Sequence, residues 1–243
     1  MLSIFCMIFL NNRLKIGQVL FNRYCLLCGA ASEHDLCTPC RHSLPHLPLH
    51  CCVVCALPVA ESRICGACLA NPPAFDRTVA ALSYTFPVDA LVHSLKYQAN
   101  LPMALVLADL LIARIDGMAL PDFVVPMPLH PRKLRERGFN QALEIARNGS
   151  KKTGTALLPS ICQRIKDTPS QIGLPWKERA KNIRDAFMCE MDLTGKHIGI
   201  MDDVMTTGAT LNELAKVLRK RGATRVSGWV VARTLPRALP RGS

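Results

Sequence analysis

Four C-x-x-C pairs lie between residues 25 and 68, and they constrain the fold of this segment more than any other feature. Each pair presents two thiols from one short turn, and tetrahedral zinc takes four sulfur ligands at about 2.3 Å. The eight cysteines therefore predict two structural zinc ions in a double zinc ribbon. Sequential pairing of the turns is favoured, and interleaved pairing is the alternative. The predicted ligands are Cys25, Cys28, Cys37, Cys40, Cys52, Cys55, Cys65 and Cys68.

Disulfide bonds are the other use of closely spaced cysteines, and they need an oxidising compartment. The first ten residues, MLSIFCMIFL, are apolar, but no basic segment precedes them and no clear cleavage site follows, unlike in a secretory signal. The run is also too short to span a bilayer. We therefore expect a cytoplasmic protein with reduced cysteines and no transmembrane segment. A peripheral contact of this run with the inner membrane is the alternative to packing on the protein.

The charge is strongly positive and unevenly distributed. The formal net charge is +12, and residues 130–184 hold 13 Lys and Arg against 4 Asp and Glu, whereas residues 1–121 hold 8 against 7. Such a basic stretch favours acidic partners, namely phosphates, nucleic acid or an anionic membrane surface. A solvated basic face is the alternative that needs no partner.

After residue 72 the pattern changes to alternating strands and helices. Short runs rich in β-branched residues predict strands, and longer amphipathic or apolar runs predict helices. This alternation is typical of an α/β domain with a largely parallel sheet flanked by helices. The predicted strands cover residues 77–86, 122–128, 197–202 and 225–233, and the predicted helices cover residues 88–100, 103–115, 138–147 and 211–222.

The run HIGIMDDVMTTGATL places two adjacent aspartates at the end of a predicted buried strand. Ionised carboxylates are costly next to each other and in apolar surroundings, so Asp202 and Asp203 need a compensating partner. The small-residue turn Thr206–Thr210 and the helix that follows it offer backbone N–H groups and hydroxyls to an anion. Carboxylates beside a phosphate site suit the hydroxyls of a ribose 5-phosphate or a divalent cation. Helix capping by Asp203 and the threonines is the simpler alternative.

This run resembles the phosphoribosyl-diphosphate (PRPP) fingerprint of type I phosphoribosyltransferases. Two further blocks, VVPMPLHPRKLRERGFNQALEIAR and RIKDTPSQIGLPWKERAKNIRDAF, follow the four cysteine pairs in the order found in the ComF (competence protein F) family. The resemblance runs from about residue 24 to residue 233. It implies a phosphoribosyltransferase-like domain over residues 73–236, a double zinc ribbon over 24–72, an extension or helix over 1–23 and a tail over 237–243.

The same resemblance implies roles for individual residues. Asp202 and Asp203 would face the ribose, Arg164 and Lys166 would lie in a catalytic loop, and the loop that begins at Met127 and Pro128 would bind diphosphate. Lys96 would lie on the lysine-containing helix of the family. The implied 5-phosphate ligands are Thr206, Thr207, Gly208, Ala209 and Thr210.

Three functions follow from these features. The ComF resemblance implies a PRPP-type site in a protein that handles single-stranded DNA during natural transformation, with Arg132, Lys133, Arg135 and Arg137 as candidate nucleic-acid contacts. One alternative is an active phosphoribosyltransferase that uses Mg²⁺–PRPP and an unidentified acceptor. The other is a zinc-ribbon adaptor that recruits DNA-translocation machinery.

Overall fold

The computed structural model describes residues 23–60, 63–167 and 183–236. The expected N-terminal helix lies outside these residues except for Arg23, and so do the expected tail and residues 168–182 of the basic stretch. The chain forms two compact units, one that ends at Leu44 and one that begins at Pro45. The second cysteine quartet therefore belongs to the larger unit. The domain boundaries expected from the sequence remain a prediction.

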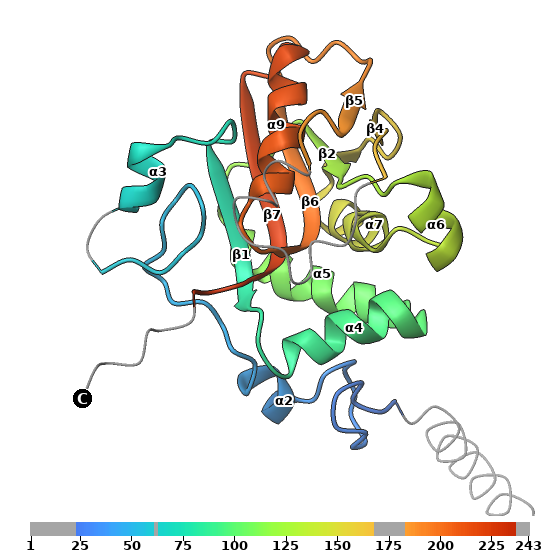
Figure 1. The fold of residues 1–243 in the computed structure, drawn as a ribbon. Helices are drawn as coiled ribbons and strands as arrows, with labels where there is room; N and C mark the ends of the chain where they lie inside the picture. Colours follow the sequence, from blue (N-terminus) through green and yellow to red (C-terminus); the bar gives the residue numbers. More distant parts are fainter. Residues whose placement is uncertain (1–22, 61–62, 168–182, 237–243) are drawn as a thin grey trace, which may run out of the picture. The chain divides into compact units, whose positions relative to one another are not determined.

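The larger unit is built on a five-stranded sheet in which every pairing is parallel (Figure 1). Its order is β1-β7-β6-β2-β3, so β6 is the central strand. This arrangement confirms the predicted α/β architecture. The strands are β1 (Arg77–Ser83), β2 (Phe123–Pro126), β3 (Ala156–Leu157), β6 (His197–Met205) and β7 (Arg225–Arg233).

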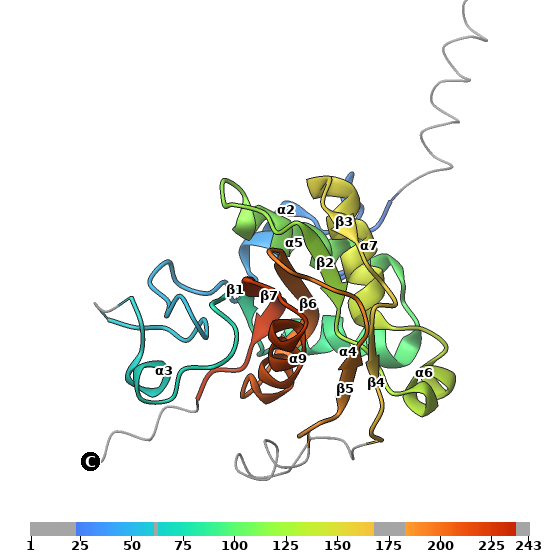
Figure 2. The same cartoon turned by 90° about the horizontal axis from the view of Figure 1, so that it is seen from above.

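Helices cover both faces of the sheet, which explains why its strands are apolar along almost their whole length. Figure 2 shows α5 and α7 against one face and α9 against the other. Gly228 of β7 allows the close approach of α9, because a Cβ there would lie 2.6 Å from a methyl carbon of Leu211. The helices of this unit are α3 (Gly66–Ala70), α4 (Val88–Gln98), α5 (Pro102–Ile115), α6 (Pro131–Arg137), α7 (Gln141–Thr153) and α9 (Ala209–Lys220).

Several predicted boundaries were wrong, and each has a local cause. The helix expected over residues 138–147 is α7, which begins at Gln141 because the side chain of Asn140 caps it, and Gly138 instead adopts the left-handed conformation that ends the unpredicted helix α6. Strand β6 continues past the two aspartates to Met205, and α9 begins before residue 211. A short antiparallel pair, β4 (Cys162–Arg164) with β5 (Phe187–Cys189), was not predicted.

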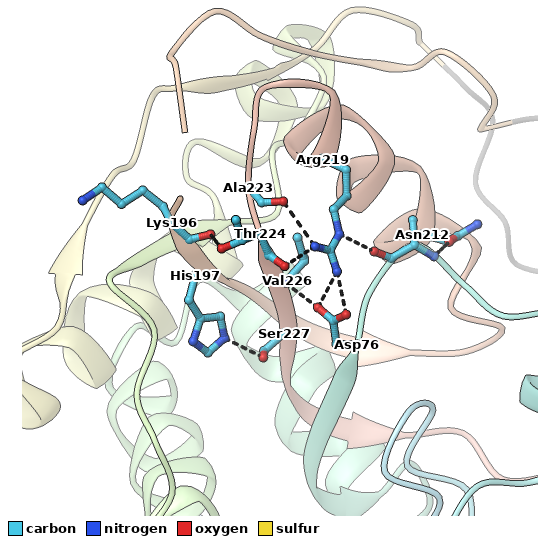
Figure 3. A network of polar contacts seen from close by, with 10 residues as sticks. Asp76, Lys196, His197, Asn212, Arg219, Ala223, Thr224, Val226 and Ser227 are labelled. Atoms are coloured by element: carbon cyan, nitrogen blue, oxygen red, sulfur yellow. Dashed lines mark hydrogen bonds and ion pairs between the residues drawn. The ribbon is translucent and has the colours of Figure 1, made fainter. Parts of the chain in front are cut away.

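A polar network at the amino-terminal edge of the sheet fixes α9 against the strands (Figure 3). The guanidinium of Arg219 donates to both carboxylate oxygens of Asp76 at 2.6 Å, and the Asp76 carboxylate also accepts from the backbone N–H of Val226 at 2.7 Å. Asn212 on the same helix accepts from the backbone N–H of Ala74 at 2.7 Å. These bonds hold both ends of α9, including the end that begins at the Thr206–Thr210 turn.

Candidate functional site

The eight cysteines form two separate quartets with the predicted sequential pairing. Within each quartet the four sulfur atoms all lie within 4.8 Å of one another. The Sγ atoms of Cys28 and Cys37 are 3.8 Å apart, and those of Cys55 and Cys65 are 3.6 Å apart. Four sulfurs about 2.3 Å from a central zinc ion would be separated by about 3.8 Å. Both quartets therefore fit a structural zinc ion.

The protonation behaviour of the thiols also suits a cation. Burial by itself would raise the pKa of Cys52. Hydrogen bonds from backbone N–H groups, including that of Cys65 at 3.3 Å, together have the larger effect and lower the pKa to about 7. Burial and the neighbouring sulfurs of Cys55 and Cys65 raise the pKa of Cys68 instead. A cation at the centre of the quartet would stabilise all four cysteines as thiolates, including Cys68. Cys51 is not a ligand of this quartet, because its thiol donates to the carbonyl of Pro48 at 3.3 Å.

The two adjacent aspartates lie near the carboxyl end of the central strand β6. Successive residues of a strand point to opposite faces, so the two carboxylates diverge. Asp203 is 3% exposed, and its carboxylate forms an ion pair with the ammonium of Lys96 on α4 at 2.7 Å. Asp202 is partly exposed, and burial together with the negative charge of Asp203 raises its pKa. Burial lowers the pKa of Lys96, but the Asp203 carboxylate more than offsets this and the net shift is upward.

The Thr206–Thr210 turn follows β6 directly and leads into α9. Gly208 has a φ of +82°, and a Cβ there would lie 2.6 Å from the terminal methyl of Met205, so the turn needs glycine. The hydroxyl of Thr207 accepts from the backbone N–H of Ala209 at 3.2 Å. Gly208 is the N-cap residue of α9 and offers no side chain to it. The turn therefore presents backbone N–H groups and threonine hydroxyls near the first turn of a helix.

A cavity of about 470 Å³, here called the Asp202 cavity, lies where β1, β7 and β6 end. It brings together five predicted site residues, namely Lys96, Asp202, Thr206, Gly208 and Thr210. In open parallel sheets, ligands bind at the carboxyl ends of the strands. Thr207 and Ala209 belong to the same turn and are partly exposed, although they do not line this cavity.

The expected diphosphate loop begins with two buried residues. The backbone N–H of Met127 donates to the carbonyl of Met201 at 2.8 Å, and its own carbonyl accepts from the side chain of Asn140 at 3.0 Å. Pro128 is buried and has no backbone N–H. These two residues therefore fix the start of the loop. The hydrogen-bond donors for a diphosphate would have to come from other residues.

Arg164 and Lys166 do not line the Asp202 cavity. Arg164 lines a second cavity of about 570 Å³ together with Pro128 and Phe139. Burial lowers the pKa of Arg164, and the carboxylates of Asp202 and Asp167 raise it by a smaller amount. The exposed side chain of Lys166 donates to the backbone carbonyl of Arg184 at 2.9 Å. The adjoining residues 168–182 lie outside the described part of the chain.

The four basic residues of α6 differ in their surroundings. Arg132 forms ion pairs with Glu136 at 2.9 Å and Asp167 at 3.0 Å. Arg137 donates to Gln141, and its guanidinium lies 5.6 Å from the ring centroid of Tyr97. Lys133 lines a small cavity that also includes Lys96, and Arg135 is exposed.

Sequence reasoning missed two groups of residues near the site. Tyr84, His93 and Tyr97 form an aromatic side of the Asp202 cavity, and the rings of His93 and Tyr97 are 4.7 Å apart. The repeat of His93 and Tyr97 four residues apart on a predicted helix was the available signal. Arg233 is buried at the end of β7, and only its place at the end of an apolar run set it apart in the sequence.

Known proteins are similar in sequence to this chain over most of its length. The DNA utilization protein YhgH of Salmonella typhimurium is 35% identical over 221 residues, which cover 87% of this chain and 97% of that protein. Competence protein F of Haemophilus influenzae is 30% identical over 226 residues, which cover 88% and 98%. The chain belongs to the ComF family. Its residues 16–69 also match the family model described as a double zinc ribbon domain.

Solved structures give weaker likenesses. A purine phosphoribosyltransferase from Pyrococcus horikoshii is 17% identical with a TM-score of 0.30, over 68% of this chain and 98% of that chain. A structure described as the allosteric regulatory enzyme of purine biosynthesis is 18% identical with a TM-score of 0.33, over 52% and 25%. At these TM-scores the likenesses carry no weight. In the described part of this ComF-family chain, every helix is too short or too polar to cross a bilayer.

We expect the purified ComF-family chain to contain about two zinc ions, one for each quartet of thiolates. Cys40→Ser and Cys68→Ser should each lower the zinc content by about one ion per chain, measured by elemental analysis. A content of one ion or none in the unaltered protein would contradict the two-site interpretation.

Asp202→Asn should stabilise the ligand-free chain at neutral and alkaline pH. The raised pKa means that the folded state holds the Asp202 proton more tightly than the unfolded state, so stability falls as pH rises above the ordinary carboxyl range. An asparagine side chain does not ionise, so the variant does not lose this stability as pH rises. Because Asp202 is partly exposed, we expect a gain of about 1 kcal/mol, or about 2–4 °C in Tm, at pH 8 and almost none at pH 4. The exposed Asp116 provides the control, and Asp116→Asn should show no such pH-dependent gain.

Proposed function

We propose that this protein binds Mg²⁺–PRPP, or a closely related phosphoribosyl ligand, in the Asp202 cavity. The observation that carries the proposal is the convergence of the Asp202 carboxylate, a threonine-glycine turn and Lys96, the ion-pair partner of Asp203, on one cavity at the carboxyl edge of the sheet. Hydroxyls of a ribose suit the carboxylates, and a 5-phosphate suits the N–H groups and hydroxyls of the turn.

The simpler capping interpretation accounts for only part of this arrangement. Among the described residues, the hydroxyl of Thr207 accepts from the start of α9, but the carboxylate of Asp203 accepts from its own neighbour Val204 at 2.7 Å. Thr206 and Thr210 line the cavity. Two carboxylates and a half-buried lysine are also more than a helix N-terminus requires.

Lys96 has a defined role in this proposal. Its ammonium neutralises Asp203 while no ligand is bound, and it lies between the Asp202 cavity and the smaller cavity that contains Lys133. When Mg²⁺ or ribose hydroxyls satisfy the carboxylates, the Lys96 ammonium becomes available to the anionic part of the ligand. Mg²⁺ itself would neutralise phosphate charge and orient the ligand.

Turnover is a second step that binding does not require. Transfer would break the bond between the ribose and the diphosphate, and cations must then stabilise the leaving diphosphate. Arg164, Lys166 and Lys133 are the candidates, because they supply positive charge near the carboxyl edge of β2 and on the segments that follow it. Release of diphosphate, measured with a panel of amine and base acceptors, would show whether the protein is a transferase.

Replacing Asp202 and Asp203 by Asn should weaken Mg²⁺–PRPP binding by about 100-fold or more, because two charge-assisted interactions are lost. Isothermal titration calorimetry measures this change, and zinc content should be unaltered. The matched control is Asp116→Asn with Glu190→Gln, which removes two exposed acidic charges elsewhere and should preserve affinity. Equal affinity of the Asp202/Asp203 variant and the unaltered protein would show that the site is wrongly placed.

We further propose that the PRPP-type site serves a protein that handles single-stranded DNA. Two observations support this, namely the excess of basic residues over 130–184 and the names of the relatives, which refer to DNA utilization and competence. Lys133 and Arg135 are the best-placed contacts, because Arg132 and Arg137 already have partners within the described structure. The zinc quartets need reduced thiols, so a reducing cytoplasmic setting suits this role. Recruitment of a DNA-translocation partner by the zinc ribbon is compatible with the same role.

If this surface binds DNA, affinity for single-stranded DNA should fall as salt rises, with a slope of about 0.7 per phosphate contacted. Lys133→Ala with Arg135→Ala should lower the slope by about 1.4, measured by fluorescence anisotropy across a salt series. Lys216→Ala with Lys220→Ala removes the same charge from α9 and should leave the slope unchanged. Affinity that does not depend on salt would exclude the basic stretch as the contact surface.

A further inference from the structure

Arg233 links the second cysteine quartet to the proposed phosphate turn. It is the last residue of β7 and is 4% exposed. Its Nε atom donates to the carbonyl of Cys55 at 2.8 Å. Its Nη1 atom donates to the carbonyl of Met205 at 3.0 Å and to that of Thr206. One guanidinium therefore joins a residue of the quartet to the end of β6 and the start of the turn.

The charge of Arg233 also needs compensation, because a buried guanidinium is costly without an opposite charge. Within the described residues its hydrogen-bond partners are carbonyl oxygens, and no carboxylate forms an ion pair with it. A zinc ion with four thiolates carries a formal charge of about −2. The second quartet therefore supplies the negative charge on the Cys55 side of the guanidinium.

The second quartet is also built into the sheet itself. The carbonyl of Val53, in the turn between Cys52 and Cys55, accepts from the backbone N–H of Thr78 in β1 at 3.0 Å. Cys52 and Cys55 are buried in the same apolar core as Met205 and Leu211. The first quartet belongs instead to the compact unit that ends at Leu44.

We propose that the second zinc site holds the Thr206–Thr210 turn in its ligand-binding shape through Arg233, and that the first zinc site does not. Filling the second quartet orients the Cys55 carbonyl and balances the guanidinium. The guanidinium in turn fixes two successive carbonyls, those of Met205 and Thr206, and thereby the direction of the N–H groups that follow. Arg233 is a positioning residue, and occupancy of one zinc site regulates the affinity of the phosphoribosyl site.

The test compares three variants of the full chain by hydrogen–deuterium exchange and by elemental analysis. Cys68→Ser empties the second site without altering the carbonyl of Cys55, and Cys40→Ser empties the first site. Arg233→Lys keeps the charge but loses the planar fork that reaches several carbonyls. Exchange is measured in the peptide 203–212, with β2 (Phe123–Pro126) as the internal control for global unfolding.

We expect Cys68→Ser and Arg233→Lys to raise exchange in the 203–212 peptide by about tenfold, which corresponds to losing one charge-assisted hydrogen bond. Exchange in β2 should not change. Cys40→Ser should lose about one zinc ion with no effect on the turn, and Arg233→Lys should keep both ions. Equal effects of Cys68→Ser and Cys40→Ser on the turn, or an unchanged turn in Arg233→Lys, would overturn the proposal.

A second measurement uses Mg²⁺–PRPP as the probe, and this part of the inference rests on the proposed function. Affinity should fall by about tenfold in Cys68→Ser and Arg233→Lys and stay unchanged in Cys40→Ser. If the unaltered protein does not bind Mg²⁺–PRPP, the proposed function fails, whereas the exchange measurement still decides whether Arg233 couples the second zinc site to the turn.

Discussion

The carboxylate of Asp203 is buried near the end of the central strand, and its ion pair with Lys96 is the interaction on which the site depends. A buried carboxylate without a partner would be strongly destabilising. The ion pair with α4 meets this requirement, and it also fixes α4 against the carboxyl edge of the sheet. Tyr97 follows Lys96 on α4 and therefore also lines the cavity. The electrostatic requirement of one residue thus shapes the cavity around it.

The parts of the site that could be predicted are local in sequence. Asp202, Asp203 and the Thr206–Thr210 turn occupy one strand–turn–helix unit, and each C-x-x-C turn is complete within four residues. Arg233 and Tyr97 reach the site only through the order of the strands, which places β7 beside β6 and α4 above their ends. A periodic pattern gives no information about such pairings between distant segments. The end of α6 at Gly138 was a missed local signal, because glycine favours the left-handed conformation that ends a helix.

The two cysteine quartets show how nearly identical spacing can serve different purposes. Both present two C-x-x-C turns, and the separation of Cys28 from Cys37 differs by only one residue from that of Cys55 from Cys65. The second quartet includes Cys52 and Cys55, which are buried in the core of the α/β unit, and it bonds to β1 and Arg233. The first quartet lies in the small unit that ends at Leu44, where Leu36 and Leu44 are the buried leucines among the described residues.

The charges around the Thr206–Thr210 turn explain why a ligand with both a cation and a phosphate suits this site. Arg233 bonds to carbonyls and not to a carboxylate in the described structure, so no acidic side chain next to the guanidinium would repel a phosphate at the turn. Asp202 lines the cavity, and Asp203 forms an ion pair with Lys96, which lines it as well. A free phosphate would satisfy the turn but be repelled by the carboxylates. A free cation would do the reverse, whereas the proposed metal-bound phosphoribosyl ligand would complement both the carboxylates and the turn.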